Sequence, residues 1–312
     1  MPVFRFRNRA FAVAVATVLA IAVSSTACAT RDSRPSPADS ASGASIVLHD
    51  DFGSVIPLGQ HPTRIVSLNP TTTEILFAVG ASSRLVGRSQ WDVFPDSARN
   101  VPSLGEALRP NVEAVIAARP DLVLLYASAD NRPAFERLRQ AGITTLAFKI
   151  DSIEQFARDA RLIGRVTGDS ARAATLVDTI EGTLARVRAA TASLPRPTVF
   201  IHTWDKPVIA IGGGSFMSEL LDIAGGRNVY ADVAAPSVTV TLEDVVQRNP
   251  DFVMASPVAA PKLLSEPSWQ TVPAIRAHHV LVYDTVLVGR PSAMLGAGAV
   301  SLAKLLHPGA VR

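Results

Sequence analysis

The chain has 312 residues, of which 48% are hydrophobic and 18% are charged. This length exceeds one ordinary hydrophobic core and suits two domains of roughly 100 to 150 residues, and the apolar content excludes a chain that is disordered throughout. The formal net charge is +3, and no Lys/Arg run beyond the N-terminus supports a nucleic-acid-binding protein.

The N-terminus has the pattern of a secretory signal peptide. Arg5, Arg7 and Arg9 precede an apolar run over residues 10–23, which is shorter than the roughly 20 residues that a membrane-spanning helix needs. A signal peptide over residues 1–27 is therefore favoured over a retained transmembrane anchor. Its removal takes away three of the 30 basic residues and none of the 27 acidic ones, so the mature chain has a net charge near zero.

Cys28 is the only cysteine, so no intramolecular disulfide is possible. The residues before it, Ser25-Thr26-Ala27, complete a segment that resembles a bacterial lipoprotein box, whose cysteine is lipidated and becomes the mature N-terminus. The alternative is ordinary signal cleavage nearby, with an incidental cysteine. The following segment is rich in Ser, Ala and Pro, which predicts a flexible tether at the start of a lead-in over residues 28–61.

The first folded lobe is predicted over residues 62–151. Apolar runs bounded by turn residues predict strands at 64–68, 85–87, 122–126 and 143–148. Helical patterns fall between them, at 74–79, 111–119 and 133–141; Thr72 or Thr73 is expected to open the first, and Gly80 to close it. Strands that alternate with helices imply a parallel sheet with helices on both faces.

A long helix over residues 169–192, within a helical segment at 152–195, is the strongest single prediction. Asp169 or Ser170 is expected to cap its start through a side-chain oxygen, and prolines follow its end. At 1.5 Å per residue it is a rod of roughly 35 Å, a candidate strut between two lobes. Its apolar residues form one stripe with alternating three- and four-residue spacing: Ala173, Val177, Ile180, Leu184 and Val187.

The second lobe is predicted over residues 196–312 and repeats the theme of the first. Its strands are expected at 198–202, 208–211, 252–255 and 280–283, and its helices at 215–223, 242–248 and 297–306. The predicted fold class is therefore α/β, with two Rossmann-like lobes joined by a single long α-helix. Each lobe is expected to be a parallel-sheet, three-layer sandwich.

Two pairs of segments match between the lobes. Glu113 precedes a proline by seven residues, as does Glu243, and Glu74 precedes a glycine by six residues, as does Glu219. Glu113 and Glu243 thus hold equivalent positions in the first turn of a short helix, where a carboxylate complements the helix dipole. Two matched acids could equally dock onto a basic partner, because arginine recognises carboxylates by charge-assisted bonds.

Several stretches together resemble one class of substrate-binding proteins for bacterial ABC importers, the vitamin B12, haem and iron-siderophore group. They are RIVSLNPTTTEILFAVGA, the pair VEAVIAARPDLVL and LEDVVQRNPDFVM, IGGGSFMSELLDIAGGRNVYAD and the long helix. The resemblance implies two α/β lobes joined by one helix, a monomer outside the cytoplasm and no catalytic activity. It also implies that Glu113 and Glu243 meet arginines of a membrane permease that works with its ATPase, and that Cys28 holds the protein at a membrane.

The resemblance places the ligand in the cleft between the lobes, where parallel strands present their carboxyl ends. Aromatic rings there could cover a macrocycle, and a basic residue of the class reaches the ligand at the position of Arg290. The backbone of the glycines could present N–H groups to a ligand, or simply form a tight turn. The candidate ligand-binding residues are Asn69, Pro70, Trp91, Tyr126, Trp204, Gly213, Gly214 and Arg290.

The ligand that the resemblance favours is a corrinoid of the vitamin B12 type, with a ferric siderophore or haem as the alternative; the protein itself is expected to carry no cofactor or metal. His202 could serve as an axial ligand, or be a hydrogen-bonded core histidine. The sequence has no GxSxG, HExxH or phosphate-binding loop. An exported two-lobed metallocycle enzyme and a non-transport lipoprotein remain the alternatives from other classes.

Overall fold

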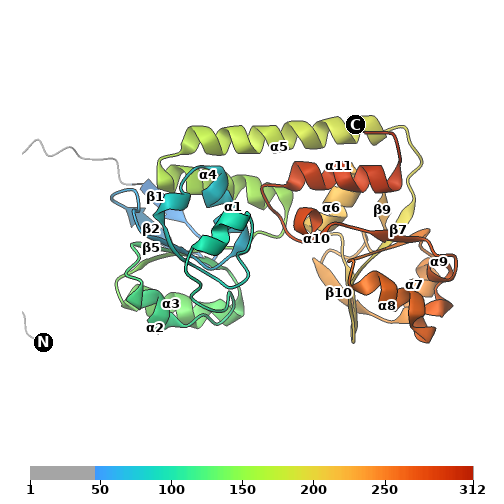
Figure 1. The fold of residues 1–312 in the computed structure, drawn as a ribbon, viewed down its shortest axis with the longest axis horizontal. Helices are drawn as coiled ribbons and strands as arrows, with labels where there is room; N and C mark the ends of the chain where they lie inside the picture. Colours follow the sequence, from blue (N-terminus) through green and yellow to red (C-terminus); the bar gives the residue numbers. More distant parts are fainter. Residues whose placement is uncertain (1–45, 312) are drawn as a thin grey trace, which may run out of the picture. The chain divides into compact units, whose positions relative to one another are not determined.

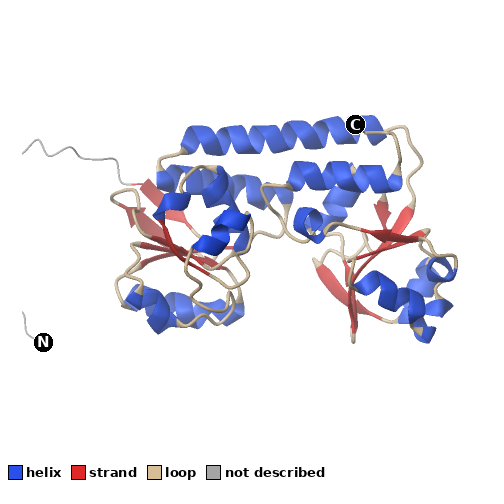
Figure 2. Ribbon diagram, in the orientation of Figure 1, coloured by secondary structure: helices blue, strands red, loops and turns tan. Residues whose placement is uncertain are grey.

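Two β-sheets flanked by helices, preceded by a two-stranded hairpin, make up residues 46–311, the part of the chain that this computed structural model describes (Figures 1 and 2). The predicted signal peptide, Cys28 and most of the predicted tether lie outside the described residues. Within residues 46–311, no helix is both long enough and apolar enough to cross a membrane.

The first sheet is entirely parallel, as predicted. Its order is β4-β3-β5-β6, and Ile65 stands opposite Leu122 in the central pair. The alternation of side chains gives the sheet two buried faces: Leu122 and Leu124 belong to one hydrophobic cluster, and Val123 and Leu125 to another. The strands are β3 (Ile65–Ser67), β4 (Leu85–Arg88), β5 (Leu122–Tyr126) and β6 (Thr144–Phe148).

Helices cover both faces of this sheet. The cluster on one face includes residues of α1 and α4, and the cluster on the other includes residues of α2 and α3. The α-helices are α1 (Pro70–Ala78), α2 (Val112–Ala117), α3 (Arg132–Gln140) and α4 (Ile153–Thr167). The 3-10 turns are η1 (Ser82–Arg84), η2 (Asp96–Asn100) and η3 (Ala129–Asn131).

Helix α1 begins four residues before the predicted start. The side chain of Asn69, and not that of Thr72 or Thr73, caps the helix by accepting a hydrogen bond from Thr71 N at 3.0 Å. Pro70 then occupies the first helical position, where its missing N–H costs nothing. Gly80, with a φ of 82°, ends the helix as predicted.

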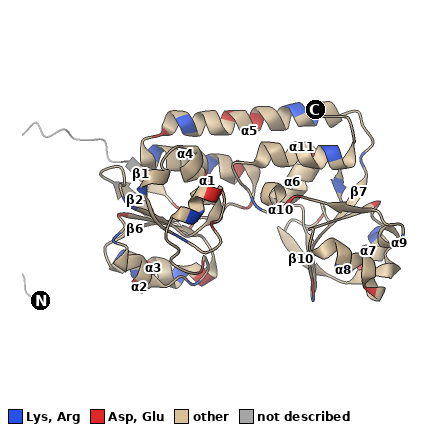
Figure 3. Ribbon diagram, in the orientation of Figure 1, with Lys and Arg blue, Asp and Glu red and all other residues tan. Residues whose placement is uncertain are grey.

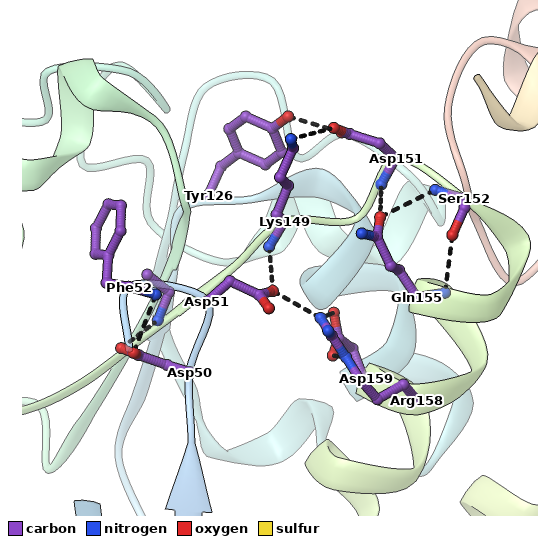
Figure 4. Close-up of polar contacts among 11 residues, drawn as sticks. Asp50, Asp51, Phe52, Tyr126, Lys149, Asp151, Ser152, Gln155, Arg158 and Asp159 are labelled. Carbon is purple, nitrogen blue, oxygen red and sulfur yellow. Dashed lines mark hydrogen bonds and ion pairs between the residues drawn. The ribbon is translucent and has the colours of Figure 1, made fainter. Parts of the chain in front are cut away.

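A hairpin that the sequence did not predict precedes the first sheet. Strands β1 (Ile46–His49) and β2 (Val55–Leu58) pair antiparallel within the predicted lead-in. The turn between them is fixed by Asp50, whose Oδ1 accepts hydrogen bonds from the backbone N–H groups of Phe52 and Ser54 (Figure 4). Asp51 joins the turn to the first lobe, because its carboxylate accepts the N–H of Lys149 and pairs with Arg158 at 2.6 Å.

The second sheet is mixed, which corrects the prediction of a parallel sheet for this lobe. Its order is β10-β8-β7-β11-β12, with β9 beside β7. Strand β11 is parallel to β7 and β12, but β8 is antiparallel to both β7 and β10. The connection from β7 to β8 consists of Lys206 and Pro207 alone, and so short a loop makes a hairpin rather than a crossover.

Two strands and three short helices of the second lobe were not predicted: β9, β10, α8, α9 and α10. The strands are β7 (Thr198–Asp205), β8 (Val208–Ile211), β9 (Arg227–Asn228), β10 (Ser237–Val240), β11 (Phe252–Ala255) and β12 (Val280–Val282). The helices are α6 (Phe216–Ile223), α7 (Leu242–Arg248), α8 (Ala259–Ser265), η4 (Pro267–Thr271), α9 (Pro273–Arg276), α10 (Thr285–Val288) and α11 (Leu295–Leu306).

Helix α5 (Ser170–Thr191) joins the lobes, and the predicted apolar stripe is buried along its length. It packs against α1 and α4 of the first lobe and against α6 and α11 of the second (Figure 1). One hydrophobic cluster consequently continues from the first lobe through α5 into the second. The predicted cap is wrong in one respect: Asp169 makes no capping hydrogen bond, and its carboxylate lies 3.7 Å from Arg84.

Candidate ligand-binding and docking sites

The two short helices that carry the matched acids, α2 and α7, are built by the same local rules. Asn111 caps α2 by accepting a hydrogen bond from Ala114 N at 3.1 Å, and Thr241 caps α7 by accepting one from Asp244 N at 3.2 Å. The acid follows as the second residue of each helix. The caps thus bring Glu113 and Glu243 to equivalent, exposed positions.

The equivalence continues beyond the helices. Arg119 and Asn249 both adopt left-handed backbone angles, with φ of 49° and 43°. Two residues later, Asp121 accepts the N–H and the hydroxyl of Thr63 at 2.8 and 2.9 Å. Asp251 accepts the same two groups of Thr198, both at 2.7 Å. The repeat seen in the sequence is therefore a repeat of hydrogen-bonded structure.

The two acids differ in their neighbours. Glu113 Oε1 accepts a hydrogen bond from Arg137 Nη2 at 2.8 Å, with both side chains largely exposed. Glu243 makes no ion pair with any residue in the described part of the chain. Hydrogen bonds from its own backbone N–H and from Thr241 hold the pKa of Glu243 below its usual value. The second lobe thus presents an unpaired carboxylate, and the first a carboxylate that is already paired.

Trp91 and Trp204 are the exposed aromatic side chains of the described chain, with 60% and 61% of their surface accessible. Trp91 follows the carboxyl end of β4, and its Nε1 donates to Glu106 Oε2 at 2.9 Å. Trp204 lies at the carboxyl end of β7, and its Nε1 donates to Lys206 O at 3.2 Å. Each ring is therefore oriented by a hydrogen bond while its apolar surface stays exposed to solvent.

Each lobe also has a hollow beside the short helix that carries its matched acid. In the second lobe, Trp204, Leu242, Lys262 and the buried Trp269 line a cavity of about 540 Å³. In the first lobe, a hollow of about 330 Å³ is lined in part by Val112, the first residue of α2. The larger cavity falls within the size range of small-molecule sites.

Tyr126, at the carboxyl end of β5, is half-buried (Figure 4). Its hydroxyl donates to Asp151 Oδ1 at 2.7 Å, and Lys149 Nζ lies 3.6 Å from the other carboxylate oxygen. Burial, together with the neighbouring Asp151 carboxylate, raises the pKa of the Tyr126 phenol. The phenol is therefore a neutral hydrogen-bond donor fixed at the edge of the first sheet.

At the start of α1, Asn69 is buried and Pro70 is half-buried. Asn69 is 5% exposed, and its Nδ2 has no hydrogen-bond partner among the described residues. A buried amide nitrogen without a partner is unusual in a folded protein.

The glycines at 212–214 pack against backbone. Gly213 N–H donates to Val233 O at 2.7 Å, and a β-carbon on Gly213 or Gly214 would collide with the carbonyl oxygens of Ala231 and Ala234. Close packing thus accounts for glycine at these positions, and the N–H of Gly213 is engaged within its own lobe.

Arg290 contacts the other lobe. Its Nε donates to Glu74 Oε1 at 2.7 Å, and its Nη2 contacts the same oxygen. The Glu74 side chain is 1% exposed, and burial raises the pKa of Glu74 to about 7 although Arg290 opposes the rise.

His202 is a hydrogen-bonded core residue, in agreement with the second of its two interpretations. Its Nε2 lies 2.9 Å from Asp205 Oδ1, and its ring packs edge-on against Trp269. Burial lowers the pKa of His202, so the imidazole is neutral at pH 7.

A family model described as "Periplasmic binding protein" matches residues 65–287. The chain belongs to this family. It is 30% identical over 274 residues to the "Uncharacterized ABC transporter substrate-binding lipoprotein YvrC" of Bacillus subtilis, covering 84% of this chain and 86% of that protein. It is 31% identical over 255 residues to the "Cobalamin-binding protein" of Halobacterium salinarum, covering 80% of this chain and 68% of that protein.

The fold is shared with solved structures of the same family. A periplasmic haem-binding protein, RhuT from Roseiflexus, superposes with a TM-score of 0.71 at 23% identity, covering 79% of this chain and 98% of that one. The class that the sequence resembles is therefore confirmed, and so is the two-lobed α/β fold.

Three polar residues of these sites escaped the sequence analysis. Arg137 lies 24 residues after its partner Glu113, and Asp151 lies 25 residues after Tyr126. Glu74 was noted only for its spacing to Gly80, although it pairs with Arg290 over 216 residues. Pairs so far apart leave no periodic signal; a charged residue within an apolar helix, such as Glu74, was the only available hint.

Proposed function

We propose that this protein is the extracytoplasmic solute-binding component of an ABC importer, and that its ligand is a corrinoid of the vitamin B12 type. The ligand is captured between the lobes and presented to a permease that works with an ATPase. Family membership and the cobalamin-binding relative support this proposal.

The observation that carries the ligand proposal is the pair of exposed tryptophans. Trp91 and Trp204 stand at the carboxyl ends of strands in different sheets, which is where ligands of α/β proteins bind. Two indole faces supply a large apolar contact with few rotatable bonds, as a corrin ring requires. Tyr126, with its oriented hydroxyl, is proposed as a polar contact to the ligand's amide rim.

Docking is proposed to use Glu113 and Glu243. Both are exposed at equivalent helix starts, and the permease would meet them with arginines. The anchor is proposed at Cys28, as in the relative named a lipoprotein. Reversing both glutamates should abolish uptake and leave ligand affinity unchanged, because neither lies among the proposed ligand contacts.

Thermal unfolding tests the ligand proposal directly. Cyanocobalamin, haem and a ferric hydroxamate siderophore are added separately; a ligand at 100 times its Kd stabilises the folded state by roughly 2.7 kcal/mol. We expect a shift with cyanocobalamin that is lost in Trp91→Ala and Trp204→Ala and retained in Val258→Ala, which removes an exposed apolar side chain elsewhere. A shift with haem or the siderophore alone would replace the corrinoid by that ligand, and no shift with any of the three would contradict all of them.

A further inference from the structure

A half-buried ion pair connects the two lobes. Glu74 belongs to α1 of the first lobe, and Arg290 follows α10 of the second. The carboxylate is 1% exposed and the guanidinium side chain 27% exposed, so the bond is largely shielded from water. A charge-assisted hydrogen bond is roughly twice as strong as one between neutral groups, and it fixes the orientation of its two partners.

One further contact joins the same elements. The hydroxyl of Thr71, in the first turn of α1, donates to Pro291 O at 2.7 Å in a buried position. Helix α1 is thus held against residues 290–291 by two side-chain hydrogen bonds.

The repeat between the lobes places a second connection opposite the first. Glu219 of α6 is the counterpart of Glu74, and its Oε2 accepts the N–H of Ile153, the first residue of α4, at 3.4 Å. Beside it, Phe216 N–H donates to Asp151 O at 2.9 Å. The equivalent glutamates, Glu74 of α1 and Glu219 of α6, therefore each accept a hydrogen bond from the other lobe.

We infer that Arg290 is a lobe-positioning residue: with Glu74 and Thr71 it forms a latch that fixes the resting separation of the two lobes. The Nε and Nη2 groups of Arg290 both contact Glu74 of the other lobe. We therefore assign Arg290 to the junction between the lobes and not to the ligand. The contact at Phe216 and Glu219 forms the second fixed point of the junction.

Inter-lobe distances measured by pulsed electron paramagnetic resonance test this inference without any ligand. The only cysteine, Cys28, is replaced by serine, and spin labels are placed at Gln140→Cys and Gln247→Cys, exposed positions of α3 and α7. We expect one narrow distance population in the parent chain. Glu74→Gln, Arg290→Gln and Thr71→Val should each broaden it, because each removes one part of the latch.

A double-mutant comparison separates a latch from independent effects. The Glu74→Gln/Arg290→Gln chain should show no more broadening than either single variant, because both changes break the same bond. Arg161→Gln, which removes an exposed ion pair with Glu181, is the matched control and should leave the distances unchanged. Unchanged distances in folded Glu74→Gln and Arg290→Gln chains, or effects that simply add, would overturn the latch.

Titration with cyanocobalamin gives a second readout, and this one rests on the proposed function. If Arg290 acts through Glu74, the two single variants should change the Kd by the same factor. A loss of affinity of tenfold or more in Arg290→Gln with unchanged affinity in Glu74→Gln would assign Arg290 to the ligand instead. Absence of cyanocobalamin binding by the parent chain would contradict the ligand proposal and leave the distance measurement intact.

Discussion

At the scale of single residues, Glu74 is the carboxylate with the largest consequence for solution behaviour. It is buried, it faces Arg290 and Asp92, and burial raises its pKa from 4.5 to about 7. A group whose pKa is raised on folding stabilises the folded state below its unfolded pKa. That stabilisation is lost as the pH rises through the folded pKa.

Glu74→Gln should therefore become more stable relative to the parent chain as the pH rises from about 4.5 to about 7. The amide cannot ionise, so it avoids a cost on the order of 3 kcal/mol that the buried carboxylate incurs over this range. The measurement is the difference in Tm between variant and parent at pH 5 and pH 8. The use of a difference cancels the contribution of Asp159, whose pKa burial also raises. A difference that stays constant between the two pH values would contradict the shift.

At the scale of elements, α2 and α7, which carry the two proposed docking acids, begin with the same kind of capping bond and end in the same kind of turn, but differ in one ion-pair partner. Arg137 of α3 pairs with Glu113, whereas Glu243 is in no ion pair of residues 46–311. An exposed pair of this kind contributes only about 0–1 kcal/mol. A permease arginine would nevertheless have to replace Arg137 before it could bind the first lobe.

Arg137→Gln should consequently strengthen docking by up to about fivefold, mainly through a faster association rate at low salt, because Glu113 is then unpaired. Binding to permease in nanodiscs measures this. Arg139→Gln is the control, since it removes the same charge from the same helix without touching Glu113. Equal rates for both variants would show that the Arg137 pair does not compete.

Elements defined by local pattern were predictable, and those defined by distant partners were not. The spacing of apolar residues placed α5, α7, β5 and β11 to within a residue or two. The start of α1 was misplaced because Asn69-Pro70 looks like a strand end, although Asn69 caps a helix. A strand was predicted at residues 208–211, but the antiparallel direction of β8 was missed. Strand direction depends on the two-residue turn at Lys206-Pro207 and leaves no trace in hydrophobicity.

The candidate site divides in the same way. Glu113 and Glu243 were predicted from their matched spacing and the family resemblance, and Trp91 and Trp204 from their places after predicted strands. The structure leaves all four exposed. The engagement of Arg290 by Glu74, of Tyr126 by Asp151 and of Gly213 by Val233 depends on the packing of distant segments. A single sequence carries no record of such packing.

At the scale of the whole molecule, the two sheets are joined by more than a linker. The hydrophobic cluster that runs along α5 contains residues of both lobes, and the buried bonds at Arg290 and Phe216 hold the junction. A rigid helix that packs on both sides resists bending. We therefore expect a small closure on ligand binding rather than a wide hinge motion.

Hydrogen exchange with and without cyanocobalamin checks the size of this motion. Protection should increase in residues 89–95 and 203–207, which carry Trp91 and Trp204, and should change little across residues 169–192. Large ligand-dependent changes in α5 would oppose a small closure. Absence of protection at both tryptophan segments would oppose their role as the ligand contacts.

The β1–β2 hairpin determines which lobe bears a mechanical force applied to the N-terminal segment. Asp51 clips the hairpin turn to Lys149 and Arg158, and Asp51 N–H donates to Ala147 O, so the incoming chain is fastened beside β6 (Figure 4). Asp51 belongs to the hairpin, and Arg158 belongs to α4 of the first lobe. Figure 3, which colours the ribbon by charge, shows basic and acidic positions on both lobes and along α5. A mechanical force applied at residue 46 would thus act on the first lobe. The second lobe is joined to the first through α5 and would not bear this force.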